Sequence, residues 1–141
     1  MHQLRQALAT DLPGMWEVRY SVAENTLTPG RLSDEDVRRS IEDTGRGWVI
    51  EDEGGIAAFA VGNAETGNVW ALFVKPAAQG RGFGSMLHDA MIEWFRSQPI
   101  RTLWLSTGKD TKARAFYEKN GWTCVGPYGA DEVRYERPNV A

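Results

Sequence analysis

A turn that contains three glycines and an arginine stands out among the residues that could do chemistry. The segment Gln79-Gly80-Arg81-Gly82-Phe83-Gly84-Ser85 lies between an apolar, strand-like run and an amphipathic helical pattern. Glycine has no Cβ, so the backbone can turn tightly and approach a ligand closely. The free N–H groups at the start of the following helix favour an anion, and the forked guanidinium of Arg81 suits a phosphate. The segment therefore predicts a cradle for a pyrophosphate group.

The spacing within this turn excludes two common nucleotide motifs. The dinucleotide fingerprint G-x-G-x-x-G requires glycine where this chain has Ser85. A Walker loop requires Lys and then Ser or Thr after its last glycine, but Gly84 is followed by Ser85 and Met86. The pattern that remains is Q-x-x-G-x-G, with Gln79, Gly82 and Gly84 at its defining positions.

A second segment reads D-T-K-A-R-A-F-Y-E-K-N-G-W over residues 110–122. Together the two segments resemble motifs A and B of the GNAT family of N-acetyltransferases, the second of which is commonly written N-x-x-A-x-x-F-Y-E-x-x-G-F. The matching positions are Ala113, Phe116, Tyr117, Glu118 and Gly121. Asp110 replaces the usual asparagine, and Trp122 replaces the usual phenylalanine. The resemblance covers roughly residues 3–137, and it implies an α/β GNAT-like acyl-CoA N-acyltransferase fold.

Hydrophobic periodicity predicts the elements that position these motifs. Their order is β-α-α-β-β-β-α-β-α-β-β, which indicates a mixed central sheet flanked by helices in a single N-acetyltransferase domain over residues 1–141. The expected strands are 3–7, 48–51, 56–61, 69–74, 103–105, 122–125 and 132–135, and the expected helices are 10–24, 33–44, 82–98 and 112–120. Ser33 with Asp36 predicts a helix cap, and Asp110 is expected to cap the helix that begins near Thr111. His88 is expected on the polar face of its helix and not as a catalytic base.

The resemblance implies that acetyl-CoA is the acyl-donor substrate, held with its pyrophosphate on the turn from Gln79 to Ser85. It also implies that backbone groups of Leu72, Phe73 and Val74 pair with the pantetheine arm as an added strand would. Acetyl-CoA is strongly anionic and the protein has a net charge of −3, so binding requires a local basic patch. Arg81 is the clearest contributor, and Lys75, Lys109 and Lys112 are further candidates, whereas Arg114 is interpreted as a solvated surface charge.

Tyr117 is the best candidate for direct chemistry, because a phenol can protonate a departing thiolate. The resemblance supports this role, since the family frequently uses the tyrosine of its Phe-Tyr pair in this way. The general base is left open. The strand before the second motif carries no carboxylate, so either Glu24 or a water held by backbone carbonyls or Ser106 is expected to accept the amine proton.

Composition bounds the remaining possibilities. A chain of 141 residues has the length of one domain, and its one cysteine, Cys124, excludes an internal disulfide. One cysteine with two histidines makes a structural metal site improbable, and the negative net charge argues against nucleic acid as a partner. The apolar runs are too short to span a membrane, and the N-terminus shows no signal peptide, so a cytoplasmic protein is expected.

Two functional hypotheses follow. The first is an N-acetyltransferase in which a primary amine of a small molecule or peptide attacks acetyl-CoA directly in a ternary complex. The second is a non-catalytic coenzyme A-binding sensor or interaction module of the same fold. The acceptor cannot be identified, because it depends on the loops over residues 19–32 and 126–131, and a homodimer is compatible with the resemblance.

Overall fold

The structure is a computed structural model, and it describes residues 2–22 and 33–139. The helices and strands follow one another in the predicted order, so this prediction is confirmed. The elements are β1 (Gln3–Gln6), α1 (Leu12–Ser21), α2 (Asp34–Glu42), β2 (Gly45–Asp52), β3 (Gly55–Asn63), β4 (Val69–Val74), α3 (Phe83–Phe95), β5 (Thr102–Gly108), α4 (Ala113–Lys119), β6 (Thr123–Tyr128) and β7 (Glu132–Pro138). Short 3-10 turns at Ala9–Asp11 and Pro76–Ala78 precede α1 and follow β4.

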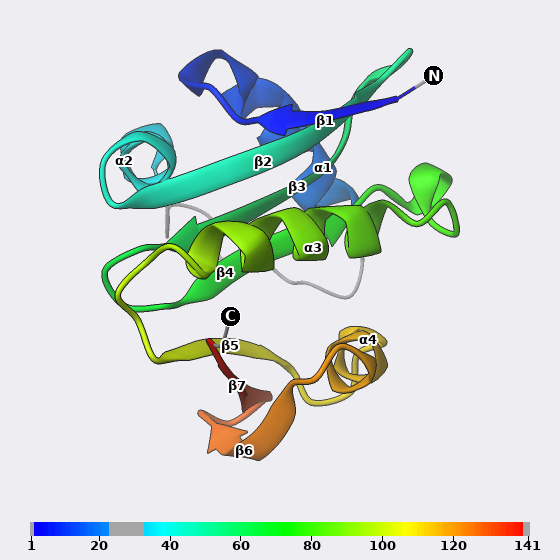
Figure 1. Ribbon diagram of the computed structural model, residues 1–141. Coiled ribbons are helices and arrows are strands. Elements are labelled where there is room, and N and C mark those ends of the chain that lie inside the picture. Colours follow the sequence, from blue (N-terminus) through cyan, green and yellow to red (C-terminus); the bar gives the residue numbers. More distant parts are fainter. Residues whose placement is uncertain (1, 23–32, 140–141) are drawn as a thin grey trace.

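The strands form two sheets that diverge from each other. The first has the order β1-β2-β3-β4 and is antiparallel throughout, and the second has the order β5-β7-β6 (Figure 1). Over the described residues, β4 and β5 are joined by one parallel bridge, between Asn68 and Trp104. The two strands therefore meet at one end and separate toward the other.

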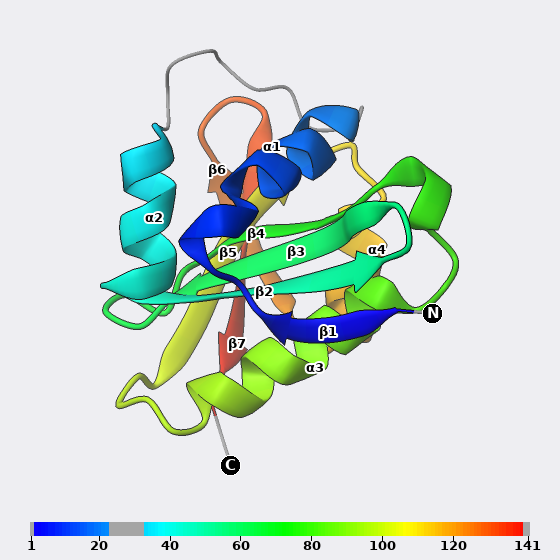
Figure 2. The same ribbon diagram turned by 90° about the horizontal axis from the view of Figure 1, so that it is seen from above.

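Strand alternation divides the core of the first sheet between its two faces. Val49 and Phe59 pack on one face with α1 and α2, whereas Ile50 and Ala58 pack on the other face with α3. The two views of the ribbon show α1 and α2 together on one side of this sheet and α3 on the other (Figures 1 and 2). This arrangement follows from period-2 side chains in strands that are covered on both faces.

The second sheet is tied to α4 through Tyr135, which is fully buried on β7. Its hydroxyl donates to Glu118 Oε2 at 2.6 Å and accepts from Arg114 Nε at 3.0 Å. Arg114 Nη1 also donates to the Lys109 carbonyl at 2.9 Å. The interpretation of Arg114 as a solvated charge is therefore wrong, because this side chain links α4 to β7 and to the preceding loop.

The two predicted helix caps have different outcomes. Ser33 accepts from the N–H of Asp36 at 3.1 Å, and Asp36 accepts from the N–H of Ser33, so the predicted capping box on α2 is confirmed. The predicted cap at Asp110 is wrong, because α4 begins at Ala113 and no side chain caps it. Thr111 instead donates to the Gly108 carbonyl at 2.9 Å, which holds these residues in a turn before the helix.

Candidate functional site

The turn between β4 and α3 depends on two glycines with positive φ. Gly80 and Gly82 have φ values of +83° and +82°, in the left-handed region that side chains with a Cβ rarely adopt. The space that a Cβ would occupy at either position is open to a distance of 4 Å. The glycines are therefore required for the backbone path, and they leave one side of the turn uncovered.

Helix α3 directs free backbone donors at this turn. Its first intrahelical bond runs from the N–H of Met86 to the carbonyl of Gly82, at 3.1 Å. The preceding N–H groups, of Phe83, Gly84 and Ser85, receive no side-chain cap. Unpaired N–H groups at the positive end of a 13-residue helix form an anion site.

Gly84 brings three predicted parts of the site together. A Cβ built at this residue would lie 3.5 Å from Phe116 on α4 and 3.9 Å from Leu72 on β4. The glycine turn, the strand before it and the second motif therefore meet at one point. The sequence pattern predicted each part, and the fold places them within van der Waals contact.

Strand β4 presents an open edge next to this point. Leu72, Phe73 and Val74 pair with β3 on one side. On the other side, the bridge between Asn68 and Trp104 is the last backbone pairing with β5 in the described part of the chain. A bulge at Trp70 interrupts the pairing with β3, since Val61 opposes Ala71 and Gly62 opposes Val69. The open backbone groups can accept an extended ligand as an additional strand.

Side chains of the turn are held loosely at its surface. Gln79 Nε2 donates to the Val74 carbonyl at 3.5 Å. Arg81 Nη1 lies 3.5 Å from Asp52 Oδ2, and its Cζ lies 4.6 Å from the centroid of the Phe83 ring. Exposed ion pairs of this kind contribute little free energy, so Arg81 can exchange Asp52 for a phosphate.

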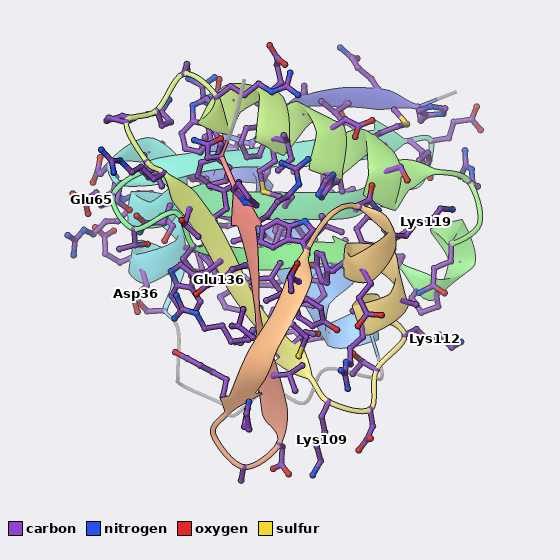
Figure 3. All side chains as sticks on the ribbon, turned by 60° about the horizontal axis from the view of Figure 1, so that its bottom comes forward. Asp36, Glu65, Lys109, Lys112, Lys119 and Glu136 are labelled. Carbon is purple, nitrogen blue, oxygen red and sulfur yellow. The ribbon has the colours of Figure 1, made fainter. Side chains whose placement is uncertain are left out.

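Charge is distributed unevenly around the molecule. Lys109, Lys112 and Lys119 lie on the side that carries α4 and its preceding loop, whereas Asp36, Glu65 and Glu136 lie toward the opposite side (Figure 3). The region near α4 is thus locally basic in a protein of net charge −3. A contact of these lysines with coenzyme A stays a prediction.

Tyr117 lies on α4 next to Phe116 and is 6% exposed. Its ring is 5.4 Å from that of Phe116 and 5.8 Å from that of Trp122, centroid to centroid. Burial raises the pKa of Tyr117 well above its ordinary value of 10.0. The hydroxyl therefore stays protonated at any ordinary assay pH, and the same burial makes it a weaker acid than an exposed phenol.

The family model for the "Acetyltransferase (GNAT) family" matches residues 2–122 of the chain. The chain belongs to this family. A mycothiol acetyltransferase from Beutenbergia cavernae is 37% identical over 84 residues, a match that covers 55% of this chain and 28% of that relative. The chain thus matches about a quarter of the length of this curated GNAT relative.

Solved structures show the same fold along the whole chain. The ribosomal-protein-S18-alanine N-acetyltransferase from Escherichia coli superimposes with a TM-score of 0.79 at 20% identity, covering 100% of this chain and 96% of that one. The PaiA N-acetyltransferase from Thermoplasma acidophilum, in complex with coenzyme A, has a TM-score of 0.83 at 16% identity, covering 98% and 99%. The predicted GNAT fold is therefore confirmed.

The backbone donors and the open space at the turn fit coenzyme A. The donors at Phe83, Gly84 and Ser85 suit a pyrophosphate, and the missing Cβ at Gly84 leaves room between the turn and α4. Within the described ranges, no group of three or more His, Cys, Asp or Glu side chains could hold a metal ion. In the same residues, no helix is long and apolar enough to cross a membrane.

Three residues need separate comment. Glu24 lies outside the described residues, so its predicted role stays a prediction. Ser106 is half-buried on β5, the strand that diverges from β4. The expected polar position of His88 is wrong, because this side chain is 3% exposed and accepts a hydrogen bond from Trp122 Nε1 at 2.9 Å. Helical periodicity could not reveal a partner that follows 34 residues later.

Proposed function

We propose that this GNAT protein transfers the acetyl group of acetyl-CoA to the primary amine of a small molecule or peptide, by direct attack in a ternary complex. The observation that carries the proposal is the open edge of β4 at Leu72–Val74, which ends beside the uncapped start of α3. An extended arm with an anionic end fits both features at once.

The donor is oriented by backbone groups and a few side chains. The N–H groups of Phe83, Gly84 and Ser85 bind the pyrophosphate, and the turn at Gly80 and Gly82 allows the backbone to approach it. Arg81 and Gln79 contribute from the side of the turn, and Lys109 and Lys112 supply positive charge near α4. The exposed carboxylate of Asp110 leaves the contact with the coenzyme to backbone groups or water. The pantetheine arm lies along Leu72, Phe73 and Val74.

In the transfer itself, the amine nitrogen attacks the thioester carbonyl carbon. A C–N bond forms, the C–S bond breaks, and a backbone N–H of β4 donates to the oxygen on which negative charge develops. Tyr117 gives its proton to the leaving sulfur, and a water held near Ser106, or Glu24, takes the proton of the attacking nitrogen. The products are an acetylamide and free coenzyme A.

The acceptor class follows from the family and not from a matched pocket. Relatives are named as a mycothiol acetyltransferase and as a ribosomal protein bS18-alanine N-acetyltransferase, and this chain matches only parts of them. We place the protein in the cytoplasm, with a free amine as its partner and a homodimer as a compatible assembly. Neither nucleic acid nor membrane is required.

A second candidate is a non-catalytic coenzyme A-binding module. The observation that favours it is the side-chain content of β5, which offers Ser106 and Thr107 where some members of the family carry a carboxylate. Such a module would bind coenzyme A through the same backbone groups and would need no proton acceptor.

One pair of measurements separates the two candidates. Calorimetry with coenzyme A tests the donor site, and thiol release from acetyl-CoA tests transfer across amines, amino acids and peptides. Thiol release that depends on an amine supports the enzyme. Tight binding of coenzyme A without amine-dependent thiol release would replace the enzyme by the binding module, and no binding would refute both.

A further inference from the structure

A cavity of about 320 Å³ lies between α3, the end of α4 and β7. Its wall includes His88, Ile92 and Arg96 from α3, Asn120 from the end of α4, and Arg137 from β7. Sites for small molecules begin at about 300 Å³, so this Arg137 cavity has room for a polyatomic ligand. An α-helix rises about 1.5 Å per residue, which places Ile92 roughly 13 Å along α3 from Phe83 at the glycine turn. The cavity is therefore separate from the turn.

Arg137 lies on the core face of β7. Side chains alternate along a strand, and Tyr135, two residues earlier, is fully buried in the core. Arg137 pairs in register with Leu103, which is also fully buried. Arg134 and Glu136 pair with each other on the opposite face of the sheet. The strand therefore places a half-buried guanidinium where an apolar side chain would extend the core.

The guanidinium of Arg137 is held against the turn that ends α4. Its Nε donates to the Asn120 carbonyl at 3.1 Å, and a Cβ built at Gly121 would lie 3.4 Å from this Nε. In the described part of the chain, Nη1 and Nη2 form no hydrogen bond and no ion pair, and neither of them is an enclosed atom. An oriented fork of two accessible, unpaired N–H groups suits the two oxygens of an oxyanion.

The carboxylates in the cavity wall do not neutralise Arg137. Glu93 Oε2 accepts from Arg96 Nη1 at 2.7 Å, so its charge is already paired. The side chain of Asp89 is 82% exposed, and water screens a charge at such a position. The charge left without a partner at the half-buried side of the cavity is therefore positive.

We infer that the Arg137 cavity is a second ligand site, which binds the phosphate or carboxylate group of a small polar molecule on the Nη1 and Nη2 atoms of Arg137. Arg96 provides a second positive charge from α3. Both kinds of group offer the paired oxygens that a planar guanidinium recognises. The site is distinct from the proposed donor site, and it does not depend on acetyl transfer.

The two histidines of the chain provide separate reporters for the two sites. His88 is buried in the wall of the Arg137 cavity, and its enclosed Nδ1 lies 3.7 Å from Asp89 Oδ1, too far for a hydrogen bond. A ligand therefore changes the surroundings of His88 without binding to Nδ1. His2 lies at the other site, with its ring 4.9 Å from that of Phe83 at the glycine turn.

The first test follows the imidazole signals of both histidines by NMR while the whole protein is titrated with inorganic phosphate or with succinate. Chloride keeps the ionic strength constant, and saturating coenzyme A occupies the glycine turn. We expect a saturable shift of the His88 signals and none of the His2 signals. The anion that binds more tightly identifies the preferred group. The proposal is overturned if neither anion shifts His88, or if coenzyme A abolishes a shift that the free protein shows.

The second test uses Arg137→Gln, with Arg134→Gln as its matched control on the other face of the same strand. Arg137→Gln should weaken the affinity for the anion by about 10- to 100-fold, as for the loss of hydrogen bonds to a charged group. Arg134→Gln should retain the wild-type affinity. Arg137→Lys keeps the charge but lacks the fork, so it should show an intermediate affinity even if Arg137→Gln fails to fold.

A pH titration of His88 gives an independent measurement. Burial and then the charge of Arg137 lower the pKa of His88. An anion on Arg137 offsets that charge, so the pKa of His88 should be higher in sulfate than in chloride at the same ionic strength. Sulfate replaces phosphate here because its charge stays constant while histidine titrates. An equal response in Arg137→Gln would show only general screening by salt, and it would overturn the proposal.

Discussion

The indole Nε1 of Trp122 donates a hydrogen bond of 2.9 Å to Nε2 of His88, and both side chains are buried. An indole N–H can only donate, so Nε2 must accept and the proton of the neutral imidazole lies on Nδ1. The bond connects the middle of α3 to the residue before β6. It therefore ties the helix that carries the anion site to the second sheet.

Removing one partner of this bond should be more harmful than removing both. Trp122→Phe leaves Nε2 of His88 buried without a donor, and we expect a loss of about 1–3 kcal/mol in the free energy of unfolding from that atom, in addition to lost packing. In the double variant His88→Leu/Trp122→Phe, the polar penalty disappears. Urea denaturation of the single and double variants should yield a less-than-additive loss. Strict additivity would show that the bond contributes nothing.

Stability should fall as the pH decreases below neutrality, and His88 should account for part of the fall. Burial, followed by the charge of Arg137, lowers the pKa of His88 in the folded state. As the pH falls below about 6.5, the unfolded chain therefore binds this proton first. The contribution of His88 is fully present above that pH and is lost below it. Melting temperatures between pH 7.5 and 5.5 should decrease more for the wild type than for His88→Gln.

Gly84→Val should weaken binding of coenzyme A with little loss of stability. The new Cβ meets Phe116 at an ordinary 3.5 Å, but the two methyl groups extend into the space between the turn and α4. Calorimetry with coenzyme A, at matched melting temperature, measures this effect. Glu93→Val, at an exposed site of the same helix, reports the cost of a β-branched residue together with the small loss of the exposed ion pair between Glu93 and Arg96. Unchanged affinity in a folded Gly84→Val variant would remove the turn from the donor site.

Gly82→Val should behave differently from Gly84→Val, because its backbone has a φ of +82°. We expect it to lower stability as well as affinity, since a β-branched residue is strained there. Gly82→Asn, which tolerates this conformation better, should recover most of the stability.

Tyr117→Phe should lower kcat by about 10²- to 10⁴-fold, in keeping with the loss of a general acid, and leave the affinity for coenzyme A unchanged. The ring packing against Phe116 and Trp122 remains in this variant. Because burial raises the pKa of Tyr117 above 10.0, the rate of the wild type should rise with pH as the amine deprotonates, without a decline from Tyr117 below pH 10.

Tyr135→Phe is the matched control for this prediction. It removes a buried hydroxyl that bonds with Glu118 and Arg114, from a ring 6.3 Å from that of Tyr117. We expect it to lower stability by about 1–2 kcal/mol while kcat is retained. Wild-type kcat in Tyr117→Phe would leave proton delivery to water.

The capping assignments can be checked with a pair of alanine variants. Ser33→Ala removes the capping box of α2 and should cost about 1 kcal/mol in the free energy of unfolding. Asp110→Ala should stay within about 0.5 kcal/mol, because Asp110 caps no helix. Equal losses in the two variants would contradict the assigned start of α4.

Local patterns in the sequence were sufficient for the order of elements and for the backbone path of the glycine turn. The strand at 69–74 and the capping box at Ser33 depend on nearby residues, and both agree with the structure. The glycine turn was recognisable because a backbone path with positive φ leaves a compositional trace. The two motifs meet at Gly84 because the fold that they imply brings α4 against the turn.

The errors concern side chains whose partners lie far away in the sequence. The helical pattern placed His88 on the polar face of its helix, whereas its burial is explained by the hydrogen bond from Trp122. Arg114 looked like a surface charge, although Tyr135 binds it from β7. Each of these environments is created by tertiary packing.

The central position of β7 has a consequence for how the protein is made. β7 is the last strand in the sequence, yet it lies between β5 and β6 and supplies both of their ladders. On the ribosome, the N-terminal sheet can pair as soon as β4 has emerged. The second sheet and the anchor of α4 at Tyr135 must wait until residues 132–138 leave the exit tunnel. During synthesis the nascent chain therefore exposes the unpaired edges of β5 and β6 until β7 arrives, and exposed strand edges of this kind can pair with other chains.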